Sequence, residues 1–146
     1  MAASRTHAST LAPAGWVSGL LDLPGLGWIA RIFLAAPFIG SGLGKAFDFP
    51  AATEEAASLG LRPVSLVAAA VILVQLAGSG LFLTRRWCWL GAGLLAGFTV
   101  VATLIAHPFW HFEGLERVRQ TATFLEHLAI VGGFLAAALL VNGRRR

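Results

Sequence analysis

The sequence predicts an all-α integral membrane protein, a four-helix bundle with up-down topology, and three observations indicate this fold. First, 57% of the 146 residues are hydrophobic and only 12% are charged, whereas about a quarter of the residues of a soluble domain are charged. Second, the apolar residues gather in four runs of about 20 residues, which as helices match the ~30 Å hydrocarbon core of a bilayer. Third, most connections are compact, which favours packing between helices that are neighbours in the chain. A soluble bundle is excluded because too few polar residues remain to coat its outer faces.

The first 25 residues, rich in Ala, Ser, Thr and Gly, predict a mobile N-terminal tail. They lack the compact charged, apolar and small-residue order of a signal peptide, and a short interfacial piece is expected around residues 16–23. A single transmembrane domain then covers residues 26–142, and residues 143–146 form a basic C-terminal tail.

The four spans are justified by their length and by the few polar residues that they contain. The first contains Arg31 and Pro37 and ends near Lys45, the second carries Gln75, the third has no charge, and the fourth has Glu126 and His127 in its first turns. The predicted spans are residues 26–47, 64–84, 87–106 and 122–141. The connections are a short helix over residues 51–59, a tight turn at Arg85-Arg86, and a polar and aromatic segment over residues 107–121.

The basic residues predict the orientation. With four spans, the two termini and the Arg85-Arg86 turn share one side of the membrane. That side carries Arg5, Arg85, Arg86, Arg144, Arg145 and Arg146, and the other carries Lys45, Arg62, Arg117 and Arg119 among five carboxylates. Because Lys and Arg near span ends favour the cytoplasmic face, both termini are expected in the cytoplasm.

Several classes of function are excluded by what the sequence lacks. One cysteine, Cys88, rules out an internal disulfide or a dithiol redox pair. The sequence has no Cys/His set with zinc spacing, no Gly-rich phosphate loop, and no ligand set for a flavin, haem or iron–sulfur cluster. The basic residues form no stripe, which argues against nucleic-acid binding.

The candidate binding site lies at the outer end of the third and fourth spans. Thr99, Thr103 and His107 recur every four residues on one helix face, and an antiparallel fourth span would bring His127 to a similar depth. With Trp110 as a flat wall, these groups suit a quinone-like ring whose oxygens bond to imidazoles. The alternatives are packing threonines that bond their own helix backbone and an interfacial belt of aromatic residues.

Charged and amide groups inside the spans also need a reason, because they are costly in lipid. Lys45 either snorkels to the headgroups or supplies positive charge to the ligand. Arg31 either snorkels or joins a polar network with Gln75 and Glu126. A metal site at His107 and His111 is disfavoured because Pro108 breaks the helix between them.

Small residues predict where helices approach closely. Gly40 with Gly44 and Gly93 with Gly97 each form a Gly-x-x-x-Gly pair, and further glycines occur at Gly78, Gly80, Gly132 and Gly133. Such pairs let helix backbones come together. They are expected to close this bundle rather than to bind a partner.

These residues resemble the DoxX family of small four-helix membrane proteins. The resemblance lies in Arg31, in Gly42-Leu43-Gly44-Lys45 at the end of the first span, in His107 and Trp110, and in the fourth span from Phe124 to Gly133. The chain departs from the family's pattern at Gln75, where the family commonly has Glu, and at His127, where it usually has Asn. The resemblance implies a bacterial inner-membrane protein with a connection to quinones, because the family is named for a subunit of a thiosulfate:quinone oxidoreductase.

The leading hypothesis is therefore a quinone-interacting subunit of, or accessory to, a membrane redox enzyme. Lys45, Thr103, His107, Trp110 and His127 would bind the quinone, and a partner protein would supply electrons. Whether the chain is itself an enzyme stays open. The alternative is a non-catalytic scaffold, assembly factor or small-molecule carrier in the membrane. A transporter is a weaker alternative because no pair of broken-helix repeats is evident.

Overall fold

The computed structural model describes residues 15–23 and 25–143, and every regular element in that part of the chain is helical. The expectations for residues 1–14 and for Arg144 to Arg146 lie outside the described residues. The elements are α1 (Gly15–Leu21), α2 (Leu26–Phe47), α3 (Phe49–Ser58), α4 (Val64–Leu83), α5 (Cys88–Ala106), the 3₁₀ turn η1 (Phe109–His111) and α6 (Gly114–Gly143).

The predicted spans are confirmed as four helices that are long and apolar enough to cross a membrane. The bounds of α2 are those predicted, and α4 and α5 differ from their predictions by one residue at one end. The short helix before α4 is also present, as α3. Within the predicted tail, α1 falls where the short interfacial piece was expected, and none of its residues is buried.

The start of the fourth span was predicted wrongly. α6 begins at Gly114, eight residues before the expected start near residue 122, and is 30 residues long. The spans were located from runs of apolar residues. The first two turns of α6 are mostly polar, so this criterion does not include them in the span. They are held as helix by local bonds such as Gln120 Nε2 to Glu116 Oε1 at 2.8 Å. Gly114, with φ of +56°, makes the sharp turn out of η1.

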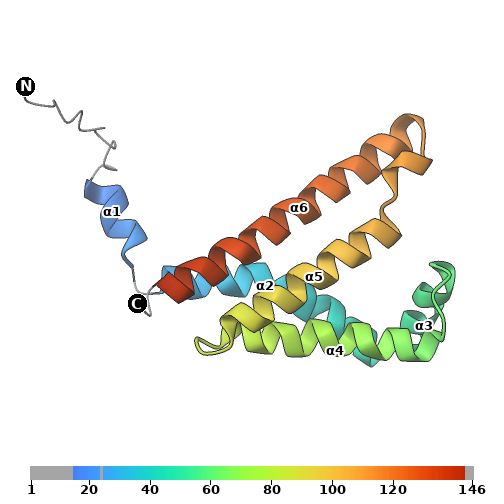
Figure 1. Ribbon diagram of the computed structural model, residues 1–146, viewed down its shortest axis with the longest axis horizontal. Helices are drawn as coiled ribbons and strands as arrows, with labels where there is room; N and C mark the ends of the chain where they lie inside the picture. The colour runs from blue at the N-terminus through green and yellow to red at the C-terminus, as the bar shows by residue number, and fades with distance from the viewer. Residues whose placement is uncertain (1–14, 24, 144–146) are drawn as a thin grey trace, which may run out of the picture.

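The helices pack against their neighbours in the chain, as an up-down bundle requires. α2 packs on α4, α4 on α5, and α5 on α6, which runs alongside it in Figure 1. We call the end with α3, η1 and the start of α6 the histidine end. The opposite end, with the start of α2, the Arg85-Arg86 turn and the last turns of α6, we call the arginine end.

Three phenylalanines from three helices pack together in the buried core of the bundle. The ring of Phe134 from α6 lies edge-on to Phe38 of α2 and Phe82 of α4, with centroids 5.4 and 4.9 Å apart. Phe82 and Phe134 are fully buried, together with Leu95 of α5. Edge-to-face aromatic packing of this kind adds to the stabilisation from burial.

The glycines at close helix contacts are only partly those that were expected. A Cβ at Gly91 would lie 2.1 Å from the Phe82 backbone nitrogen, and one at Gly78 would lie 2.9 Å from Leu95. A Cβ at Gly40, Gly44, Gly93 or Gly97 would meet nothing within 4 Å. Gly78 and Gly133, where a Cβ would lie 3.2 Å from Leu34, confirm part of the expectation, whereas the two Gly-x-x-x-Gly pairs meet no other helix. Spacing places two glycines on one helix face, but it does not say which face meets another helix.

Candidate functional site

A cavity of about 530 Å³ opens at the histidine end and is lined by residues of α2 to α6. Most of its lining is apolar, for example Val71, Phe98 and Ile130. The polar residues on its walls are Ser41, Lys45, Glu55, Gln75, Thr99, His107 and His127. We call it the histidine-end cavity. A largely apolar space with a few polar groups is typical of small-molecule sites.

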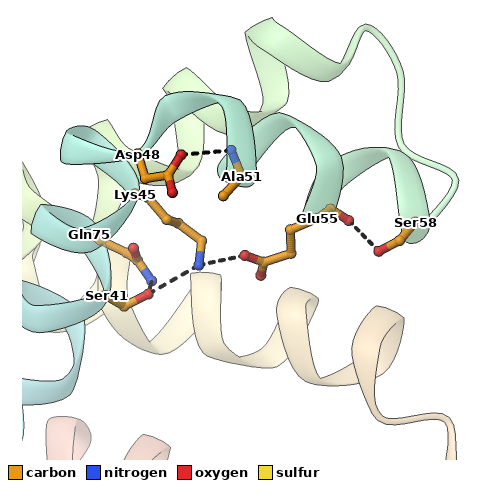
Figure 2. Close-up of polar contacts among 7 residues, drawn as sticks. All are labelled: Ser41, Lys45, Asp48, Ala51, Glu55, Ser58 and Gln75. Carbon is orange, nitrogen blue, oxygen red and sulfur yellow. Dashed lines mark hydrogen bonds and ion pairs between the residues drawn. The ribbon is translucent and has the colours of Figure 1, made fainter.

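One wall carries a chain of polar contacts that joins three helices (Figure 2). Lys45 Nζ lies 2.7 Å from Glu55 Oε2, and it also donates to Ser41 Oγ at 3.4 Å. The Gln75 amide nitrogen donates to the same oxygen at 3.2 Å. The chain of contacts therefore runs from α4 through α2 to α3.

Local sequence explains why Glu55 reaches Lys45. Asp48 ends α2 and begins α3, and its carboxylate accepts a hydrogen bond from the Ala51 backbone N–H at 3.1 Å. Pro50 lies in the first turn of α3, where the missing N–H costs nothing. This tight junction folds α3 back so that its inner face, with Ala52 and Ala56 buried, covers the end of the bundle.

A second wall carries two histidines, and the Nδ1 atom of each ring is hydrogen-bonded to a neighbouring side chain. The rings of His107 and His127 lie edge-to-face with centroids 5.2 Å apart. His127 Nδ1 lies 2.7 Å from Thr103 Oγ1, and His107 Nδ1 lies 2.8 Å from Gln120 Oε1. The first contact joins α6 to α5, and the second joins α6 to His107, the residue that caps the end of α5.

The bonding pattern assigns the protons of the two rings. Thr103 Oγ1 donates its one proton to the Thr99 carbonyl at 2.6 Å, so it accepts from His127 Nδ1. The amide oxygen of Gln120 can only accept, so His107 Nδ1 donates to it. Each ring, when neutral, is therefore left with Nε2 as a hydrogen-bond acceptor.

Gln75 adds a third acceptor to the site. Its side chain is 5% exposed, and its Oε1 atom is buried with no hydrogen-bond partner among the described residues. An unpaired buried carbonyl is costly unless a ligand or water supplies a donor. The site thus combines one cationic donor, Lys45, with acceptors at Gln75 and at the two histidines.

The predicted ligand-binding residues are brought together only in part. Lys45, His107 and His127 line the histidine-end cavity. Thr103 is buried behind His127 and does not line it. Trp110 lies outside, 48% exposed, where its ring packs on Phe109 with centroids 5.1 Å apart. Trp110 therefore does not form the flat wall that was expected.

The three residues of the predicted polar network lie apart. Arg31 is buried at the arginine end, where its Nε donates to the Gly27 carbonyl at 3.2 Å. Gln75 bonds to Ser41, and Glu126 is exposed on α6. The prediction required three helices to turn these side chains toward one another. The sequence locates the helices but does not fix their rotation, and in the structure the side chains point to different parts of the bundle.

Some residues of the site were not predicted from the sequence. Ser41, one turn before Lys45, is the shared acceptor on one wall, and Glu55 pairs with Lys45 from α3. Gln120 was missed because its segment was expected to be a loop. Placed on a helix, Gln120 and His127 lie seven residues apart on one face, which is a signal that periodicity could have found.

No metal site emerges from the described part of the chain. Within residues 15–23 and 25–143, no group of three His, Cys, Asp or Glu side chains is placed to hold a metal ion. His111 is exposed and packs against Trp110 with ring centroids 5.8 Å apart.

Comparison with known proteins places this architecture in a family. No curated protein and no solved structure is significantly similar to the chain. The sequence profile of the DoxX family matches residues 27–108, which is more than half of the chain. The match runs from the start of α2 to the residue after His107, so it includes Lys45, Gln75 and both threonines of α5, while α6 lies beyond it. The chain belongs to the DoxX family.

Proposed function

We propose that the histidine-end cavity binds the ring of a membrane quinone, and that the protein acts as a subunit of, or accessory to, a membrane redox enzyme. The observation that carries the proposal is the meeting of Lys45 with His107 and His127 around one apolar cavity of about 530 Å³. This volume lies within the range of typical small-ligand sites, about 300–1,000 Å³.

The hydrogen-bonding groups of the cavity match both forms of such a ring. A quinone carbonyl can accept a bond from Lys45 Nζ, which has a third proton beyond those directed at Glu55 and Ser41. The hydroxyls of a quinol can donate to Gln75 Oε1 and to histidine Nε2. Histidines are suited to take up or release the protons that accompany quinone chemistry.

Electrons would come from a partner protein. The described residues include one cysteine, Cys88, which is buried at the start of α5 near the arginine end. The role of the chain would then be to bind the quinone, orient its oxygens and exchange protons with it.

We also infer that the protein lies in a bacterial inner membrane with its arginine end in the cytoplasm. Arg85 and Arg86 are both exposed at that end. At the histidine end, Lys45 is paired with Glu55, and Arg119 lies 3.7 Å from Glu116. With the chain ends of the sequence counted, six basic residues flank the spans on the arginine-end side and four on the other, which agrees with the positive-inside rule.

The proposal is tested by quinone binding to the full chain in lipid nanodiscs, with short-tailed ubiquinone and menaquinone analogues as probes. His107→Ala and Lys45→Met should each weaken binding about three- to tenfold, as expected for the loss of one or two hydrogen bonds. Two matched controls lie at the same end but outside the cavity: His111→Ala removes an exposed imidazole, and Arg117→Met removes an exposed cation.

The controls should bind as the unaltered protein does. Equal affinity of His107→Ala and the unaltered chain would contradict the proposal, and so would a lack of any quinone binding. In either case a scaffold, assembly factor or carrier of another apolar molecule becomes the leading function. Mass spectrometry of molecules that co-purify with the protein would then identify what the cavity holds.

A further inference from the structure

A second cavity, of about 790 Å³, lies at the arginine end between the first half of α2 and the last turns of α6. α2 contributes residues from Gly27 to Leu34, and α6 contributes residues from Gly133 to Val141. The helices approach closely where Gly133 faces Leu34, because a Cβ on this glycine would lie only 3.2 Å from the leucine side chain. We call this space the arginine-end cavity.

Arg31 is the unusual residue of this cavity. It is 7% exposed, and its guanidinium lies 4.2 Å from the centre of the Trp28 ring. Nε bonds to the Gly27 carbonyl, but Nη1 is buried with no hydrogen-bond partner among the described residues. A buried guanidinium N–H without an acceptor is costly, so an acceptor from outside the chain would stabilise it.

The charge of the cavity indicates the kind of acceptor. Arg85 lines it together with Arg31, and neither Asp nor Glu occurs among its described lining residues. The rest of the lining is apolar or small, including Phe33, Leu140 and Ala136. The site therefore places two guanidinium groups beside an apolar groove. Guanidinium groups match phosphate in both charge and geometry.

The position of the arginine-end cavity along the helices favours a lipid headgroup as the source of that phosphate. Arg31 is the sixth residue of α2, so it lies roughly 8 Å along the helix from Leu26. Trp28 and Trp87 near the same end are typical of residues at the headgroup level. Basic pockets between transmembrane helices at this level suit anionic lipid headgroups.

We propose that the arginine-end cavity binds an anionic phospholipid. Arg31 and Arg85 contact its phosphate, and an acyl chain lies along Phe33, Leu140 and Val141. The proposal is independent of quinone binding, because it concerns a different cavity at the opposite end of the bundle.

The test measures phospholipid binding to the full chain in detergent by native mass spectrometry and by the midpoint of thermal unfolding. Dioleoyl phosphatidylglycerol should bind at least about tenfold more tightly than dioleoyl phosphatidylcholine, because only the former has net negative charge. Arg31→Gln should remove about tenfold or more of that affinity. Arg86→Gln is the matched control, because Arg86 is exposed near the same end and does not line the cavity.

A second variant keeps the test decisive if Arg31→Gln does not fold. Ala136→Phe keeps both arginines and fills the space where the acyl chain would lie, and Ala136 is exposed, so the larger side chain has room. It should also lose phosphatidylglycerol binding. Three results would each overturn the proposal: equal losses in the Arg31 and Arg86 variants, unchanged binding to Ala136→Phe, and inorganic phosphate that binds as tightly as phosphatidylglycerol.

Discussion

At Gly91 the backbones of α4 and α5 come closer than any side chain would allow. A Cβ there would lie 2.1 Å from the Phe82 nitrogen and 2.6 Å from the Gly78 carbonyl oxygen. Both obstacles are backbone atoms, so no rotamer change can make room. The two helices would have to move apart where the end of α4 packs against the start of α5.

Gly91→Ala should therefore destabilise the protein by about 1–3 kcal/mol, the usual cost of overpacking a core. The matched control is Gly93→Ala, two residues along the same helix, where a Cβ would meet nothing within 4 Å. It should be neutral or stabilising by up to about 1 kcal/mol, because alanine is the better helix former. Thermal unfolding in detergent measures both, and equal effects would show that α4 and α5 do not approach closely at Gly91.

Ser41 is the residue on which one wall of the histidine-end cavity depends. Its hydroxyl oxygen accepts from both Lys45 and Gln75. Ser41→Ala would leave the buried amide nitrogen of Gln75 without its acceptor, a loss of about 1–3 kcal/mol of stability.

The control for Ser41 is Ser58→Ala. The Ser58 hydroxyl is exposed and donates only to the Glu55 carbonyl, 2.8 Å away in the last turn of α3. Its loss should cost less than about 0.5 kcal/mol, as for most surface substitutions. If the two variants unfold at the same temperature, Ser41 does not hold Gln75 in place.

At the scale of elements, the start of α6 decides how the two histidines are held. Gln120 can bond to His107 only because the polar segment before residue 122 is already helical. The helix extends beyond the apolar run because its first turns form internal bonds and pack on η1. Binary patterning detects the part of a helix that faces lipid, and it does not detect a polar extension into water.

Proline substitution tests this start. Val118 is exposed and lies in the second turn of α6, so Val118→Pro would cost about 3 kcal/mol through the lost backbone bond and the clash with the preceding turn. Leu115→Pro, also exposed but in the first turn, should be tolerated because its N–H has no partner within the helix. If α6 began at residue 122 instead, both variants would unfold like the unaltered protein.

At the scale of the whole molecule, the four spans place the two cavities at opposite ends. The histidine-end cavity is lined by residues of five helices, α2 to α6, whereas the arginine-end cavity lies between α2 and α6 beside Arg85. Each cavity therefore depends on how helices that are distant in the chain pack together. Each cavity has a buried polar atom without a partner in the described chain, Gln75 Oε1 at one end and Arg31 Nη1 at the other.

Orientation is the prediction that belongs to this scale. With four spans, a reporter fused to the C-terminus and one placed in the Arg85-Arg86 turn should report the same side, and a reporter in the α3–α4 connection the other. Activity of a cytoplasm-dependent reporter at the C-terminus agrees with the positive-inside rule. Activity only of a periplasm-dependent reporter there would reverse the assignment of the two cavities to the two leaflets.

The sequence alone determined the membrane class, the number of spans and the bounds of α2, α4 and α5 to within one residue, because the length of an apolar run is set by the thickness of the bilayer. It also indicated that Lys45, His107 and His127 needed a reason to lie in or near lipid, since polar groups there are costly. Only the tertiary structure decided which of these residues meet. The rotation of each helix about its axis decides which side chains face each other, and it turns Arg31 of α2 away from Gln75 of α4. The same rotation decides which glycines lie where two helix backbones approach. Rotation depends on side-chain packing summed over the whole bundle, and no local pattern in the chain records that sum.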